Sequence, residues 1–181
     1  MARTSRDRFP DDVISLSVSE SVSVGTLLPL PTATDPDHGR FSVTGYRLQA
    51  DADVAETFEL VMTRDGGGGG GDGALSVQLE VRRALDRELH DHYSLRVVAA
   101  DGDARGASNS GSVDVRIDVV DVNDNRPRFE GEGRYEVTVP ENLALHTTIL
   151  RVQASDIDDG PNGQVRMCVS TIECRCLYDL S

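Results

Sequence analysis

Acidic and amide side chains gather in short clusters along this chain. Glu20 stands in SES, and Asp86 and Glu88 stand two positions apart in LDRE. Residues 121–125 read DVNDN, and residues 156–163 read DIDDGPNG. Ca²⁺ takes about six to eight oxygen ligands from carboxylates, amide side chains and backbone carbonyls. Clusters of this composition therefore indicate a site for a hard divalent cation.

The spacing within the clusters favours the same chemistry. Residues two apart on an extended segment point in the same direction, so a DxD or DxE pair aims two carboxylates at one point. Arg126-Pro127 follows DVNDN and holds the chain extended. Carboxylates packed together without a cation repel by roughly 4 kcal/mol per pair at about 4 Å and an effective dielectric near 20. The alternative is a solvated acidic surface without metal.

The overall charge excludes several classes of partner. The formal net charge is −13, with 31 Asp and Glu against 18 Lys and Arg. This excess argues against binding to nucleic acid and to an anionic membrane surface. No segment approaches the roughly 18 apolar residues of a membrane span, and residues 1–12 lack the apolar region of a signal peptide. We expect no direct membrane insertion by this chain, no leader and no membrane anchor.

The sequence contains an internal repeat. Residues 17–37 resemble residues 138–158, because Glu20, Asp35 and Asp37 each meet an acidic residue 121 positions later. The pattern predicts one complete repeat and the start of a second.

Strands should build each repeat. Apolar and polar residues alternate over 75–81, 93–97, 113–119 and 135–139, and more weakly over 26–30, 44–50 and 57–62. A period of two marks a strand with one buried face. No segment carries a convincing helical pattern. About seven short strands in a repeat favour an all-β fold, an antiparallel sandwich with Greek-key connections.

The expected organisation has five parts. Residues 1–12 form an N-terminal extension, 13–125 a complete repeat, 126–132 a linker, 133–170 a truncated second repeat, and 171–181 a divergent tail. The run Gly66–Gly71 should be a flexible loop between strands, since no GK[ST] follows it. Residues after about 130 should be poorly ordered or aggregation-prone in isolation, because a partial sandwich exposes its core face.

Taken in order, these segments resemble the cadherin superfamily. The matching segments are LDRE, AADGD at 99–103, DVNDNRPRF, PEN at 140–142 and DIDDGPNG, and the resemblance covers about residues 13–170. Its character is protocadherin-like or Dachsous/Fat-like. The resemblance implies a seven-stranded Greek-key β-sandwich of the cadherin type. It also implies three calcium ions at each junction between repeats.

The resemblance also assigns ligands, which all lie at the junction that follows the first repeat. The expected side-chain ligands are Glu20, Asp86, Glu88, Asp121, Asn123, Asp124, Asp156 and Asp158; Val122, Asn125 and Asn162 would offer backbone carbonyls. Gly163 would permit a tight loop after Asn162. The counterpart of Asp101 would fall near position 222, beyond this chain, so the outermost ion should bind weakly.

A second, incomplete site is expected at the other end of the first repeat. Asp35, Asp37 and Asp101 would form a half-site that waits for an upstream repeat. Asp101 by itself fits equally well as a turn aspartate, so this assignment stays open.

The predicted function is that of a calcium-dependent cell–cell adhesion fragment. Tandem repeats rigidified by calcium would bind another cadherin, in a homophilic or heterophilic manner, and no small-molecule substrate is expected. The parent protein would lie in the plasma membrane, with these repeats on its extracellular side.

Two other interpretations compete with adhesion. The first is a carboxylate-based hydrolase, which we disfavour because the acids sit among Asn and Gly and because the histidines form no spaced metal-binding pair. The second is a non-adhesive truncated or mis-spliced product of a long cadherin. The three cysteines, Cys168, Cys174 and Cys176, lie in the tail, and a CxC motif alone is a weak sign of a zinc or redox site.

Overall fold

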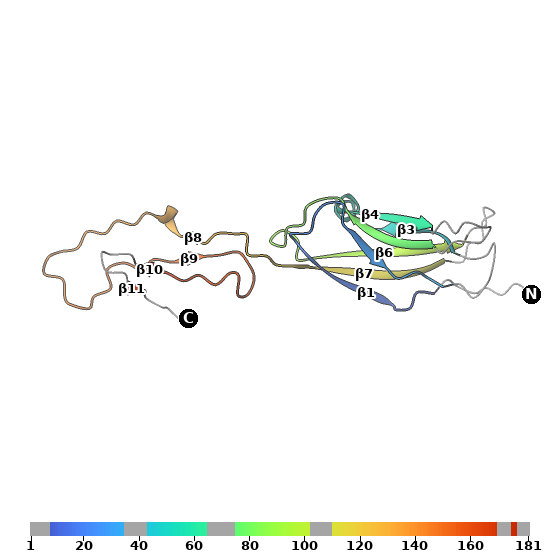
Figure 1. Ribbon diagram of the computed structural model, residues 1–181. Coiled ribbons are helices and arrows are strands. Elements are labelled where there is room, and N and C mark those ends of the chain that lie inside the picture. Colours follow the sequence, from blue (N-terminus) through green and yellow to red (C-terminus); the bar gives the residue numbers. More distant parts are fainter. Residues whose placement is uncertain (1–7, 35–42, 65–74, 102–109, 170–174, 177–181) are drawn as a thin grey trace, which may run out of the picture. The chain divides into compact units, whose positions relative to one another are not determined.

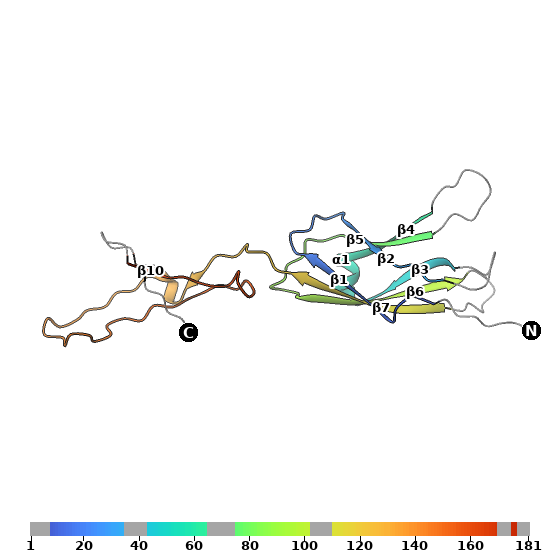
Figure 2. The same ribbon diagram turned by 60° about the horizontal axis from the view of Figure 1, so that its bottom comes forward.

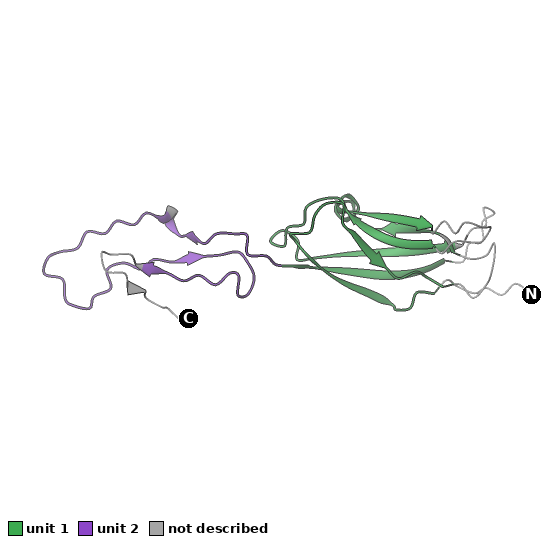
Figure 3. Ribbon diagram, viewed as in Figure 1, with its two compact units in different colours: residues 1–120 green, residues 121–181 purple. Residues whose placement is uncertain are grey.

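The computed structural model describes residues 8–34, 43–64, 75–101, 110–169 and 175–176. The chain divides into two compact units, residues 1–120 and residues 121–181 (Figure 3). We refer to them as unit 1 and unit 2.

Unit 1 is a β-sandwich (Figure 1). Its described strands are β1 (Val13–Ser19), β2 (Leu27–Leu30), β3 (Val43–Gln49), β4 (Phe58–Arg64), β5 (Leu75–Val81), β6 (His92–Asp101) and β7 (Ser110–Val120). One sheet has the order β1-β7-β6-β3 and the other the order β2-β5-β4, and Figure 2 shows them as two layers. The predicted seven-stranded sandwich is thereby confirmed for the described part of unit 1.

Strand alternation supplies the core between the two sheets. In β5 the side chains of Val77, Leu79 and Val81 are 0–1% exposed, whereas the residues between them remain partly exposed. In β7 Val113 and Ile117 are equally buried. The core is therefore rich in Val, Leu and Ile, as expected for strands with one buried face.

Strand β1 runs parallel to β7, with Ile14 opposite Val115 and Ser19 opposite Val120. Strand β1 was not among the predicted strands, although Ile14, Leu16 and Val18 alternate with serines. Just beyond the strand, the backbone N–H of Glu20 donates to the carbonyl of Val120 at 3.1 Å. This pairing brings Glu20 to the end of β7, a hundred positions away in sequence.

Two local features of unit 1 were not expected. A short helix, α1 (Ala52–Thr57), precedes β4, and it carries only six residues, too few for a recognisable helical period. Within residues 1–12, Phe9 is 6% exposed and packs against Tyr46, with ring centroids 6.2 Å apart. A single apolar residue in a charged segment offered no pattern from which to predict this burial.

Unit 2 contains little regular structure among its described residues. Strand β8 (Arg128–Phe129) pairs with β9 (Ala154–Ser155), and β10 (Cys168–Val169) pairs with β11 (Arg175–Cys176); η1 is a 3-10 turn at Gly131–Gly133. The predicted strand over 135–139 is wrong: Val137 and Val139 lie in irregular backbone and are 47% and 45% exposed. Alternation alone does not make a strand, which needs a hydrogen-bonding neighbour and a surface to cover.

Several predicted features lie outside the described residues. These are Asp35, Asp37, the run Gly66–Gly71 and Cys174. Asp101 ends β6, and Cys168 stands opposite Cys176 in the β10–β11 register. In the part of the chain that the structure describes, no helix is long and apolar enough to cross a membrane.

Candidate metal-binding site

Three predicted ligands of unit 1 lie close together. Glu20, Asp86 and Glu88 each offer a carboxylate oxygen, and these oxygens lie within 4.8 Å of one another. Glu20 is 7% exposed, Glu88 is partly buried and Asp86 faces solvent. We call these three residues the unit 1 cluster.

A short turn after β5 positions Asp86 and Glu88. Leu85 is 6% exposed and anchors the segment in the core. The Oδ1 atom of Asp86 accepts the N–H of Leu89 at 3.1 Å, and the Asp86 carbonyl accepts the N–H of His90 at 2.9 Å. Asp86 thus stabilises the turn that brings Glu88 into the cluster.

Arg87 contacts two carboxylates of the cluster. Its backbone N–H donates to Glu20 Oε2 at 2.8 Å. Its side-chain Nε and Nη2 donate to Glu88 Oε1 at 3.1 Å and 2.9 Å. Arg87 was not among the predicted site residues, because only groups with oxygen ligands were considered. Its position between Asp86 and Glu88 in LDRE was the feature of the sequence that could have identified it.

The local electrostatics favour a cation at this cluster. Burial raises the pKa of the Glu88 carboxyl above its ordinary value, and the nearby charge of Glu20 raises it further. The backbone hydrogen bond and Arg87 act in the opposite direction without cancelling the increase. A divalent cation would stabilise these charges, because it supplies the positive charge that burial and mutual repulsion demand.

In unit 2, Asp121 ties the DVNDN segment to the DIDDGPNG loop. Its Oδ1 accepts the N–H of Asp159 at 3.1 Å, and its Oδ2 accepts the Nδ2 of Asn162 at 2.8 Å. Asn123 Nδ2 in turn donates to the Asn162 carbonyl at 3.4 Å. These bonds join two segments that lie almost forty positions apart in sequence.

In the described part of unit 2, Asp158 is the residue with a carboxylate oxygen that most clearly lacks a hydrogen-bond donor. Its Oδ1 accepts Asn125 Nδ2 at 2.8 Å, and its N–H donates to Asp156 Oδ1 at 3.2 Å. Asp158 is 7% exposed, and among the described residues its buried Oδ2 has no hydrogen-bond partner. A buried carboxylate oxygen without a partner is costly, so it calls for a cation or an ordered water.

Gly163 lets the loop close on itself. A Cβ atom at this position would lie 2.2 Å from the backbone carbonyl oxygen of Asp158. That oxygen cannot retreat as a flexible side chain would, so the loop accommodates only glycine here. The structure gives a steric reason for the glycine that the sequence predicted to permit a tight loop.

The two units therefore assemble the predicted ligands differently. Glu20, Asp86 and Glu88 meet in unit 1, and hydrogen bonds link the predicted residues of unit 2. Those residues are Asp121, Asn123, Asp124, Asn125, Asp156, Asp158 and Asn162; Asp124 Oδ1 accepts Asn125 Nδ2 at 2.9 Å. Val122 is partly buried. All of these predicted ligands would offer oxygen atoms to a metal ion, and a set of oxygen ligands suits calcium.

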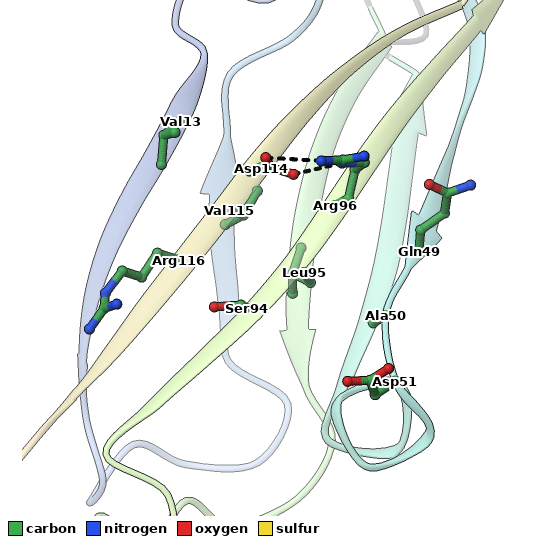
Figure 4. A pocket seen from close by; sticks show the side chains of 10 residues that line it. All are labelled: Val13, Gln49, Ala50, Asp51, Ser94, Leu95, Arg96, Asp114, Val115 and Arg116. Atoms are coloured by element: carbon green, nitrogen blue, oxygen red, sulfur yellow. Dashed lines mark hydrogen bonds and ion pairs between the residues drawn. The ribbon is translucent and has the colours of Figure 1, made fainter.

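A separate hollow opens on the outer face of the four-stranded sheet (Figure 4). Across it, Arg96 on β6 makes a forked ion pair with Asp114 on β7, at 2.6 Å and 3.0 Å. The lining residues are Val13, Gln49, Ala50, Asp51, Ser94, Leu95, Arg96, Asp114, Val115 and Arg116. Neither Asp86 nor Glu88 lines it, so it does not provide the pocket that a hydrolase built on those two acids would need.

Comparisons with known proteins agree with this architecture. The family model described as "Cadherin domain" matches residues 14–119. The chain is 37% identical over 157 residues to human Protocadherin-17, and this match covers 87% of the chain. It is 40% identical over 157 residues to human Protocadherin-16, again over 87% of the chain. The chain spans only 13% and 4% of the lengths of these two curated relatives.

Among solved structures, the chain matches the crystal structure of Protocadherin Gamma C5 EC1-3. The TM-score is 0.77 and the identity 33%, with 90% of this chain and 48% of that chain covered. Cadherins are non-enzymatic, so the prediction that the protein is not an enzyme is confirmed. The chain belongs to the cadherin family, as the cadherin-repeat region of a protocadherin-like protein.

Proposed function

We propose that the unit 1 cluster and the ligand segments of unit 2 together bind calcium and stiffen the junction between the two repeats. The observation that carries the proposal is the pair of incomplete oxygen sets. One is the close trio of Glu20, Asp86 and Glu88. The other surrounds Oδ2 of Asp158, which has no hydrogen-bond partner in the described part of the chain. The chain connects the two sets directly, because Asp121 follows Val120, the last residue of β7. The ligand set is the one that the resemblance implies, with Val122, Asn125 and Asn162 offering their carbonyls.

Calcium would change the mechanics of the junction for electrostatic reasons. Without the ion, seven carboxylates repel one another, and the residues that join the units have little core to hold them. With calcium bound, several carboxylates would coordinate the same ion, and the residues that join the two units would become rigid. The half-site of Asp35, Asp37 and Asp101 would act in the same way toward a preceding repeat.

Calcium titration of residues 1–181 tests this proposal. Isothermal titration calorimetry should detect binding at micromolar to millimolar calcium. Calcium should raise the melting temperature and reduce the range of particle dimensions in small-angle X-ray scattering. Asp124→Ala should abolish most of both effects. Asp114→Ala is the matched control, because it removes a carboxylate that is 53% exposed and pairs with Arg96 instead of an acid cluster. Absence of calcium binding up to several millimolar would refute the proposal.

We further propose that the stiffened repeats contribute to adhesion by binding another cadherin, homophilically or heterophilically, outside the plasma membrane. Membership of the cadherin family supports this role. The assay is aggregation of beads coated with residues 1–181, with calcium and with chelator, and with protocadherin-coated beads as heterophilic partners. Calcium-dependent aggregation is expected in at least one pairing. Calcium binding without any aggregation would separate the metal site from the adhesive role and overturn the latter.

A further inference from the structure

We propose that Arg87 is a built-in counter-ion of the unit 1 cluster, which neutralises Glu88 when calcium is absent and competes with calcium when it binds. The inference rests on the proposed calcium site and adds to it a residue that sets its affinity. Arg87 is not an oxygen ligand, so it lies outside the ligand set described above.

The ion pair between Arg87 and Glu88 is largely shielded from solvent. The side chains of Arg87 and Glu88 are 17% and 14% exposed. Those of Arg96 and Asp114, by comparison, are 52% and 53% exposed. Exposed pairs are screened and contribute little, whereas a pair shielded from water interacts strongly. The Arg87 guanidinium therefore acts on Glu88 with an effect that an ordinary surface arginine lacks.

The geometry of the pair places Arg87 on a single oxygen of Glu88. Arg87 Nε and Nη2 both donate to Glu88 Oε1. A cation that takes ligands from Glu20, Asp86 and Glu88 must approach oxygens within 4.8 Å of one another, where Arg87 already holds one of the three carboxylates. Calcium must either displace the guanidinium or tolerate its positive charge nearby. Either event weakens calcium binding.

The contacts of Arg87 with Glu20 and with Glu88 are separable. Its backbone N–H holds Glu20, and only its side chain holds Glu88. A side-chain substitution therefore leaves the backbone contact with Glu20 in place while it removes the positive charge beside Glu88. The affinity of the cluster can thus be tested without dismantling the turn.

The test compares wild-type 1–181 with Arg87→Gln, Arg87→Lys and Arg96→Gln, using calorimetric titration with CaCl₂ and thermal melting in EDTA. Arg87→Gln should bind calcium about fivefold more tightly, the size expected from screened repulsion between a unit charge and a divalent ion several ångströms apart. It should also melt at a lower temperature in EDTA. Arg87→Lys, which keeps the charge, should stay close to wild type. Arg96→Gln changes the net charge equally at an exposed pair; it should leave the calcium affinity unchanged and lower the melting temperature in EDTA by no more than the loss of one surface ion pair gives.

The outcomes separate the two proposals. If wild type binds calcium and Arg87→Gln binds it equally or more weakly, the counter-ion role is wrong and the calcium site stands. If wild type binds no calcium, the proposed function fails and the competition fails with it. If Arg87→Gln unfolds in EDTA and regains its circular dichroism in calcium, the counter-ion role is supported, because the ion then replaces the missing charge.

Discussion

Replacing Glu88 by glutamine should make the ion-free protein more stable and the calcium-loaded protein less stable than wild type. Glu88 shares the unit 1 cluster with Glu20 and Asp86, at oxygen separations within 4.8 Å. Glutamine keeps the shape and an oxygen acceptor for Arg87, but it removes the negative charge. The perturbation therefore isolates electrostatics from packing.

The magnitude follows from the cluster geometry. At about 4.8 Å, each carboxylate pair repels by roughly 0.9 kcal/mol at the dielectric constant of water and by roughly 3.5 kcal/mol at an effective value of 20. Removing two pairs relieves about 1.7 kcal/mol at the lower bound. Glutamine keeps an acceptor for Arg87, so a charged hydrogen bond becomes a neutral one, at a cost of about 1 kcal/mol. The raised pKa of Glu88 fixes the sign of the balance, because the folded ion-free protein already disfavours its charged form. We expect a net stabilisation of about 1 kcal/mol, or about 4 °C in melting temperature.

The assay is differential scanning calorimetry of Glu88→Gln and wild type, in EDTA and in saturating calcium. Glu59→Gln is the control, because Glu59 is 58% exposed and pairs with Arg82 at 3.1 Å. The Glu88 variant should melt higher than wild type in EDTA and should lose most of the increase that calcium gives wild type. A lower melting temperature in EDTA, or a full calcium-induced increase, would refute the electrostatic reasoning.

Three further predictions test the core, a surface ion pair and the loop of unit 2. Leu79→Ala removes a side chain with 0% exposure and should cost about 2–5 kcal/mol in urea unfolding, and a smaller loss would contradict its central place. The hydrogen bond from Arg96 lowers the pKa of Asp114 below its ordinary value, so the stabilisation is present above the ordinary pKa and is lost as the pH falls through the lowered one. Asp114→Asn should therefore cost at most about 1 kcal/mol at pH 7 and progressively less as the pH falls through the lowered pKa, and a penalty constant with pH would argue against the ion pair. Gly163→Ala should weaken calcium binding at least tenfold in calorimetry while the melting of unit 1 in EDTA stays unchanged, because the new Cβ would meet the Asp158 carbonyl at 2.2 Å; unchanged affinity would show that the loop adapts.

The sequence was informative wherever a short segment carried its own signal. The alternation over 75–81 and 113–119 predicted β5 and β7, since a strand with one buried face imposes a period of two. The order of LDRE, DVNDN and DIDDGPNG indicated the family and named the acidic residues that the structure brings together within each unit. The alternation over 135–139 predicted a strand that does not form, because these residues pair with no strand among those that the structure describes.

The tertiary structure decided what depends on contacts between distant residues. Only the parallel pairing of β1 with β7 carries Glu20 to the turn of Asp86 and Glu88. Only the folded turn lets Arg87 hold Glu20 by its backbone and Glu88 by its side chain. Residue type and spacing determine which groups are able to bind a cation. Their distances, burial and partners depend on chain segments that come into contact only in the folded protein. A local sequence pattern carries no information about such long-range contacts.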